Sequence, residues 1–187
     1  MIPAPREHLL VVAATAIELE WVVGAESLIV GVGPVEAALA TAHRLAEDPP
    51  ELVLHLGIAG ARRASGVAIG SLVIGTDSRY TDLVAQSPLL VASCVPDGDL
   101  FSRVCALLPR AARLPIATSA AVGGGAGMDV EAMEGFGVLR AAEQAGIPAV
   151  ELRAISNIVE ETDRSRWDIG AALAALADAG RTLVARL

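Results

Sequence analysis

The sequence predicts an α/β fold, because short apolar runs bounded by turn residues alternate along it with segments of helical pattern. Of the 187 residues, 53% are hydrophobic and 19% are charged, so the chain can bury a large core. No linker-like stretch divides the sequence, and the glycine tract at residues 123–127 is too short to separate two domains. We therefore expect one domain over residues 1–187.

Short apolar runs that end at Gly, Pro or polar residues predict buried strands. They lie at residues 9–14, 28–32, 52–56, 69–76, 89–94, 114–122 and 150–155. The first run follows Glu7 and leads into Glu18 and Glu20, which favours a buried strand over the apolar part of a signal peptide.

Helix signals separate these strands and predict helices over residues 34–45, 97–108, 129–145 and 167–184. Pro34 is favoured in a first turn, and Asp97 and Asp129 are typical N-caps. Gly146 stops the third helix. The apolar side of the last helix is formed by Ile169, Leu173, Leu176 and Leu183.

The composition favours a small-molecule ligand. The 14 basic and 22 acidic side chains give a net charge of −8, which offers no electrostatic footprint for nucleic acid. No stretch is long and apolar enough to span a bilayer. Cys94 and Cys105 predict reduced thiols in a cytoplasmic protein, and the histidines have no metal-ligand spacing, with His55 expected in the core. Gly31 and Gly33 lack the third glycine of a dinucleotide fingerprint, so we expect no cofactor.

Two candidate ligand segments follow the first and third predicted strands, where open α/β sheets bind ligands. Glu18 is placed to orient and deprotonate a water molecule, and a solvated glutamate in a first helical turn is the alternative. Ile58, Ala59 and Gly60 read as a turn of small residues that lets a flat or anionic ligand approach backbone amides. An ordinary tight turn is an equal alternative for this segment.

Two further candidate segments follow later in the chain. Glu134 can accept hydrogen bonds from two adjacent hydroxyls, and Met133 can pack on a sugar ring; a helix-start acidic pair with a core methionine is the alternative. Arg153 lies in an apolar strand and needs an internal acidic partner, which predicts a structural salt bridge. Asn157 can bind the edge of a heterocycle, with a turn residue bonded to its own backbone as the alternative.

These segments, in this order and at roughly these spacings, resemble the nucleosidase branch of the nucleoside phosphorylase superfamily, and most of all the futalosine hydrolases. The resemblance is carried by residues 12–15 leading to Glu18, by residues 133–135, and by residues 153–157 continued by 163–167. It implies a three-layer fold with a central mixed sheet flanked by helices. It also implies hydrolysis of the N-ribosyl bond of futalosine to release hypoxanthine, in menaquinone biosynthesis.

The resemblance also implies a role for each candidate residue. Glu18 and Asn157 would be catalytic, the first by activating water and the second by stabilising the departing base. Met133 and Glu134 would hold the ribose. The rest of the substrate site would be lined by Ile58, Ala59, Gly60 and Val122. A homo-oligomer, a dimer or higher, is implied as well. Residues 79–82 follow a predicted strand, and we expect them near its interface.

Three features differ from the adenine-directed nucleosidases of this superfamily. Asn157 stands where they have Asp, Ile58 where they have Ser, and residues 121–123 where a Phe stacks on the purine. An asparagine amide can donate hydrogen bonds to both O6 and N7 of a 6-oxopurine, and an unpaired polar group in a buried site costs about 1–3 kcal/mol. Asn157 therefore favours hypoxanthine as the leaving group.

Four alternatives stay open from the residues. The first is an adenine-directed nucleosidase, and the second is a non-catalytic nucleoside-binding protein of the same fold. The third is a Rossmann-type cofactor-binding module, against which the missing glycine counts. The fourth is a phosphorylase that uses Arg62 and Arg63 at a phosphate site, although Glu18 would repel phosphate there. We favour hydrolysis.

Overall fold

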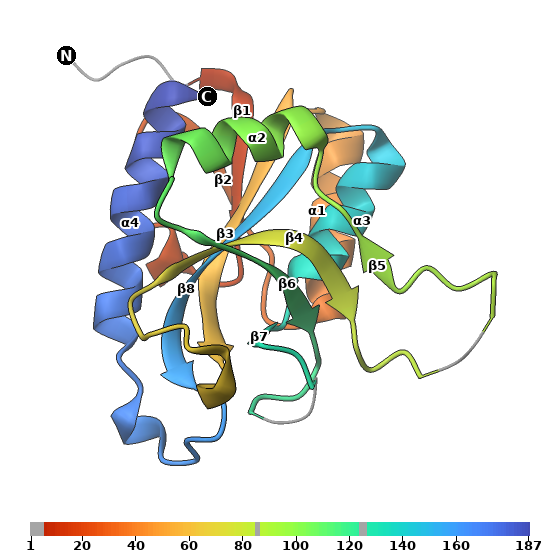
Figure 1. Cartoon of the computed structure of the whole chain (residues 1–187). Coiled ribbons are helices and arrows are strands. Elements are labelled where there is room, and N and C mark those ends of the chain that lie inside the picture. The colour runs from red at the N-terminus through yellow and green to blue at the C-terminus, as the bar shows by residue number, and fades with distance from the viewer. Residues whose placement is uncertain (1–5, 85–86, 124–126) are drawn as a thin grey trace.

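The computed structural model describes residues 6–84, 87–123 and 127–187. Within these residues the strands form one eight-stranded mixed sheet (Figure 1). The strands are β1 (Arg6–Ala13), β2 (Ala25–Ile29), β3 (Leu52–Ala61), β4 (Leu72–Tyr80), β5 (Ser93–Cys94), β6 (Ala112–Thr118), β7 (Val130–Ala132) and β8 (Ala149–Ile158). The helices are α1 (Pro34–Glu47), α2 (Gly98–Leu107), α3 (Gly135–Ala145) and α4 (Ile169–Arg186), with short 3-10 turns at Ala16–Glu18, Arg63–Ser65 and Arg164–Arg166.

Strand β3 is the centre of the sheet. It runs parallel to β1 on one side and to β8 on the other, and β2 extends the sheet beyond β1. The end of β3 also pairs antiparallel with β7, while β8 pairs antiparallel with the start of β4. Since β4 pairs with β6 and β6 with β7, the strands β3, β8, β4, β6 and β7 close into a ring.

The interior of this ring is an apolar cluster to which each of its strands contributes. The cluster consists mainly of Ala59, Ala61, Val73, Ile116, Val130, Ala132 and Ile155. Alternate residues of each strand point into the ring. Because the enclosed space is narrow, small and β-branched side chains fill it.

Helices cover both faces of the open part of the sheet. Helices α2 and α4 lie on one side, and α1 and α3 lie on the other (Figure 1). The first core contains Leu54, Leu152, Val104 and Leu176, and the second contains Val12, Val53, Ala37 and Val138. Neighbouring residues of β3, such as Val53 and Leu54, thus belong to opposite cores, as the period of two requires. The predicted three-layer α/β architecture is confirmed.

One predicted helix begins later than expected. We expected a helix from Asp129, but residues 130–132 form β7 and α3 begins at Gly135. The backbone of β7 pairs with both β3 and β6, and these partners are distant in the sequence. A local capping signal cannot show such pairing.

Several predicted strand limits were also wrong. Ile58, Ala59 and Gly60 do not form a turn but lie within β3, because β8 pairs with β3 as far as Ala61. Asn157 likewise lies inside β8 and not after it. Of the predicted strand at residues 89–94, only Ser93–Cys94 form a strand, β5. The predicted strand at 28–32 begins and ends three residues earlier, as β2. In the described part of the chain, no helix combines the length and hydrophobicity that a membrane span requires.

Candidate active site

A cavity of about 220 Å³ lies beyond the carboxyl ends of β1, β3 and β8. All eight residues predicted for the site line it: Glu18, Ile58, Ala59, Gly60, Val122, Met133, Glu134 and Asn157. They come from segments far apart in the sequence, and the sheet brings them together because its parallel strands end at one edge. The cavity is largely apolar, with three lining carboxylates, Glu18, Glu131 and Glu134.

Glu18 is held in a fixed orientation at the end of the 3-10 turn that follows β1. Its Oε2 accepts hydrogen bonds from the backbone N–H of Thr15 at 3.0 Å and from the Thr15 hydroxyl at 2.7 Å. Its Oε1 accepts from the backbone N–H of Ile58 at 3.0 Å. The side chain is buried, so the alternative of a solvated surface glutamate is wrong. A carboxylate fixed by three donors beside a cavity is suited to orient a small polar molecule.

Glu134 is the residue that precedes α3, and it is 4% exposed. Its Oε1 accepts from the backbone N–H of Gly33 at 3.1 Å, and its Oε2 accepts from Arg153 Nη2 at 3.4 Å. Burial raises the pKa of Glu134 and the nearby carboxylates Glu18 and Glu151 add to this, while Arg153 and the Gly33 N–H oppose it. Each oxygen keeps lone-pair directions for a ligand.

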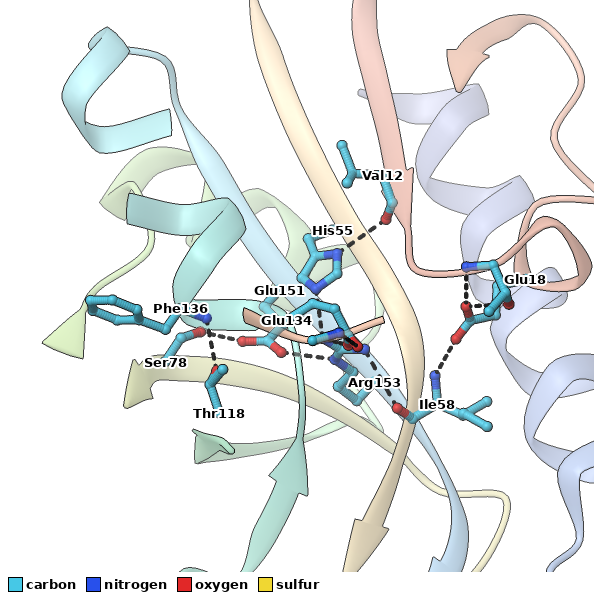
Figure 2. A network of polar contacts seen from close by, with 12 residues as sticks. Val12, Glu18, His55, Ile58, Ser78, Thr118, Glu134, Phe136, Glu151 and Arg153 are labelled. Atoms are coloured by element: carbon cyan, nitrogen blue, oxygen red, sulfur yellow. Dashed lines mark hydrogen bonds and ion pairs between the residues drawn. The ribbon is translucent and has the colours of Figure 1, made fainter. Parts of the chain in front are cut away.

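Arg153 lies at the centre of a buried polar network, the Arg153 network, which comprises His55, Glu134, Glu151 and Arg153 (Figure 2). Its Nε donates to Glu151 Oε1 at 2.8 Å, and its Nη2 lies 2.5 Å from His55 Nε2. Burial lowers the pKa of Arg153, but the charges of Glu151 and Glu134 outweigh burial and the pKa is raised. The predicted structural salt bridge of Arg153 is confirmed.

His55 and Glu151 complete the Arg153 network. His55 is fully buried, as predicted, and its Nδ1 lies 3.1 Å from the carbonyl oxygen of Val12 (Figure 2). Burial and the adjacent Arg153 cation hold the pKa of His55 well below its ordinary value. The imidazole is therefore neutral, with Nδ1–H donating to Val12 and Nε2 accepting from Arg153. Glu151 is also fully buried, and its Oε2 accepts from the hydroxyl of Ser78.

Two glycines make room for the Arg153 network. A Cβ at Gly57 would overlap the guanidinium of Arg153, and a Cβ at Gly135 would overlap the carboxylate of Glu151. The first turn of α3 is fixed in addition by Thr118, whose hydroxyl accepts from the backbone N–H of Phe136 at 2.8 Å. These close approaches place Glu134 at the cavity.

Asn157 lies near the end of β8 and is 6% exposed. Its Oδ1 accepts from the Ser156 hydroxyl at 2.9 Å, and its Nδ2 donates to the carbonyl of Ile158 at 3.3 Å. An asparagine amide has two N–H donors, and among the described residues only Ile158 accepts from one of them. The amide can therefore donate to a ligand in the cavity.

Val122 lies at the edge of the cavity on the segment that follows β6, and it is half-exposed. This segment is held by Asp82, whose carboxylate accepts from the Ser119 hydroxyl at 2.9 Å and from the backbone N–H of Ala120 at 2.6 Å. Asp82 belongs to the segment 79–82 that we expected near a subunit interface. The expected interface stays a prediction.

Sequence reasoning missed part of the cavity. Trp167 lines it from the segment before α4, and Ile169 and Leu173 line it from the first turns of α4. The sequence marks Trp167 only through the resemblance, and the other two only as part of an apolar helix side. Residues 169 and 173 are four apart and share one helix face, which is the signal that could have found them. His55 and Glu151 carried a different signal, since each is a polar residue inside an apolar run.

The phosphorylase alternative has no supporting geometry at the cavity. Arg62 and Arg63 do not line the cavity, and Arg62 Nε instead lies 3.7 Å from Glu160 Oε1. Across residues 6–84, 87–123 and 127–187, no group of three or more His, Cys, Asp or Glu side chains is arranged to hold a metal ion. Cys94 and Cys105 are buried free thiols.

Comparison with known proteins gives a consistent result. The family model of the phosphorylase superfamily matches residues 23–187. A futalosine hydrolase of Streptomyces coelicolor is 36% identical, covering 83% of this chain and 77% of that protein. The structure of the futalosine hydrolase of Helicobacter pylori aligns with a TM-score of 0.86 at 15% identity, over 97% of this chain and 98% of that one. A methylthioadenosine/adenosylhomocysteine nucleosidase of Neisseria meningitidis, bound to methylthio-immucillin-A, aligns with a TM-score of 0.85 at 21% identity, over 97% and 100%.

Proposed function

The chain belongs to the phosphorylase superfamily and, within it, to the futalosine hydrolases, and from this premise we propose that it hydrolyses the N-ribosyl bond of futalosine and releases hypoxanthine. The observation that carries this proposal is the convergence of Glu18, Glu134 and Asn157 on one cavity from three distant parts of the chain. Each of these side chains has the chemistry that one part of the reaction needs.

The reaction develops positive charge on the sugar and negative charge on the base as the bond stretches. Glu18, fixed by Thr15 and Ile58, orients and deprotonates the attacking water. Glu134 accepts hydrogen bonds from the two ribose hydroxyls, and Met133 packs against the ring. The two carboxylates also stabilise the developing positive charge on the sugar.

Asn157 stabilises the departing base. With its Oδ1 engaged by Ser156, the amide donates its free N–H to the N7 and O6 edge of hypoxanthine, and its second N–H becomes available there when the long contact with the carbonyl of Ile158 is released. The 6-amine of adenine is itself a donor, so an amide that donates at this position matches hypoxanthine better. Ile58, Ala59, Gly60 and Val122 line the part of the cavity that holds the base in this proposal.

The cavity favours hydrolysis over phosphorolysis. Among its described lining residues there are three carboxylates and no cationic side chain. A phosphate ion would be repelled by these carboxylates and would find no charged partner. Water is therefore the nucleophile.

The proposal extends to assembly and cellular role. Exposed apolar side chains on α1 and beside it support a homo-oligomer, a dimer or higher; they are Ile29, Val32, Val35 and Leu39. Sedimentation or light scattering of the purified protein tests this, and a monomer at micromolar concentration would refute it. We propose that the enzyme acts in the cytoplasm, in menaquinone biosynthesis. Deletion of its gene should therefore impair growth, and added menaquinone should restore it.

Base release tests the reaction directly. Purified protein is incubated with futalosine, inosine or methylthioadenosine, with and without phosphate, and the products are separated by chromatography. We expect hypoxanthine from futalosine, at a rate independent of phosphate. Glu18→Gln should lower kcat by about 100-fold or more, whereas Glu20→Gln, a charge-matched change at an exposed neighbour, should leave kcat unchanged. Preferential release of adenine, or full activity of Glu18→Gln, would refute the proposal.

A further inference from the structure

We propose that His55 is a positioning residue that orients Arg153, and through it the carboxylate of Glu134, for binding the ribose hydroxyls. The inference rests on the proposed function, in which Glu134 holds the ribose. His55 does not line the cavity, so it acts through its neighbours. A buried histidine that only fills the core is the simpler alternative, and it makes a different experimental prediction.

The hydrogen bonds of His55 fix both the ring and its protonation. Val12 is the residue that pairs with His55 across β1 and β3, and its carbonyl oxygen accepts a hydrogen bond from Nδ1–H of His55. The lone pair of Nε2 is then the only acceptor that the ring can offer to Arg153. His55 thus presents one fixed acceptor at a set position between β1 and β8.

The planar guanidinium of Arg153 is held at two of its edges. Glu151 accepts from Nε at 2.8 Å, and His55 accepts from Nη2 at 2.5 Å. Nη2 carries two hydrogens, and Glu134 Oε2 is its second partner at the longer distance of 3.4 Å. The shorter contact to His55 fixes Nη2, and its second N–H is thereby directed at Glu134.

This arrangement fixes Glu134 before any ligand binds. One carboxylate oxygen is held by the Gly33 N–H and the other by Nη2 of Arg153, so the plane of the carboxylate is set. Without the acceptor at His55, the guanidinium keeps its contacts with Glu151 at 2.8 Å and with the carbonyl of Ile58 at 3.5 Å, but nothing on the His55 side holds Nη2 in place, and the planar group can pivot so that Nη2 moves away from Glu134. The binding of a cis-diol would then weaken, while the contacts of the base with the cavity would remain.

The test compares acceptor-retaining and acceptor-free variants. His55→Gln places a side-chain oxygen near the position of Nε2, whereas His55→Leu removes every polar atom. Both are made in the Glu18→Gln background to prevent turnover, and the dissociation constants of inosine and 2′-deoxyinosine are measured by calorimetry. We expect about tenfold tighter binding of inosine in the parent and in His55→Gln, and a ratio below about threefold in His55→Leu.

Two controls separate positioning from folding. Val53→Ala shortens a buried side chain on the same strand and the same side as His55, and it should keep the parent ratio. If His55→Leu does not fold, His55→Val serves as a second acceptor-free variant with a smaller side chain. Equal ratios in all variants, or equal binding of the two nucleosides by the parent, would overturn the inference. A wild-type protein that shows the expected ratios but releases no base would refute the proposed reaction alone.

Discussion

Replacing Arg153 by Met tests the energetics of the Arg153 network. The variant keeps most of the side-chain volume and removes the charge. Glu151 is then fully buried with Ser78 as its remaining hydrogen-bond donor among the described residues, and His55 Nε2 loses its donor. Removing one partner of a buried ion pair costs about 3–5 kcal/mol, because the remaining charge is uncompensated. We expect Arg153→Met to lose that much free energy of unfolding at pH 7.

The expected loss is measurable by heat or urea. For a chain of 187 residues, one kcal/mol shifts Tm by about 2–4 °C, so Tm should fall by about 6–20 °C. The loss should also depend on pH. Burial already raises the pKa of Glu134, and removal of Arg153 raises it further. A carboxyl whose pKa is higher in the folded state contributes stability below its ordinary pKa of 4.5 and loses it as pH rises through the folded pKa. The deficit of Arg153→Met should therefore shrink toward pH 4.5.

A second variant and a surface control complete the experiment. Glu151→Gln combined with Arg153→Met should recover part of the loss, because the orphaned carboxylate is removed as well. Arg181→Met removes an arginine whose ion pair with Asp178 is exposed, and it should change stability by less than about 0.5 kcal/mol. If the free energy of unfolding of Arg153→Met lies within about 1 kcal/mol of the wild-type value at pH 7, the buried charges are compensated in some other way and the reasoning fails.

Three further predictions concern other buried groups. Gly57→Ala should cost about 1–3 kcal/mol in urea unfolding, because its Cβ would overlap the Arg153 guanidinium; unchanged stability would contradict the packing. The folded state depresses the pKa of His55 below its ordinary 6.5. The stability advantage of the wild type over His55→Gln should therefore fall by about 1.4 kcal/mol per pH unit as pH drops below 6.5, and a difference that does not change with pH would show that folding leaves this pKa unshifted. Burial, with help from Glu143, raises the pKa of Cys94 to about 12. Iodoacetamide should therefore alkylate Cys94 only after unfolding, and mass spectrometry would detect the added mass.

Local signals predicted the elements that local chemistry determines. Helix α1 begins at Pro34, and Asp97 accepts from the backbone N–H of Leu100 at 2.9 Å to cap α2, as the residues indicate. Helix α3 ends at Gly146, whose positive φ of 70° suits glycine. These features depend on contacts within four residues, and a sequence displays such contacts directly.

Features that depend on distant segments could not be predicted in the same way. Strand β7 is three residues long, and only its pairing with β3 and β6 makes it a strand. The pairing of Glu151 with Arg153 is an exception, because residues two apart in one strand point to the same side. The other partners, His55 and Glu134, belong to a different strand and a helix cap, and only the folded chain brings them to the guanidinium. Eight of the described residues that line the cavity were predicted, from the ends of strands and from the resemblance, and their catalytic roles stay predictions.

Three members of the Arg153 network lie behind the cavity surface, and only Glu134 lines the cavity, which has a consequence for engineering. Each member of the network satisfies a charge or lone pair of another, so a single exchange there leaves a costly orphan and improvement must proceed by coordinated changes. Asn157 and Val122 are different, because they hydrogen-bond or pack mainly against their own surroundings at the cavity. A designer who wants another nucleobase released should randomise these two positions first and leave the supporting charges untouched.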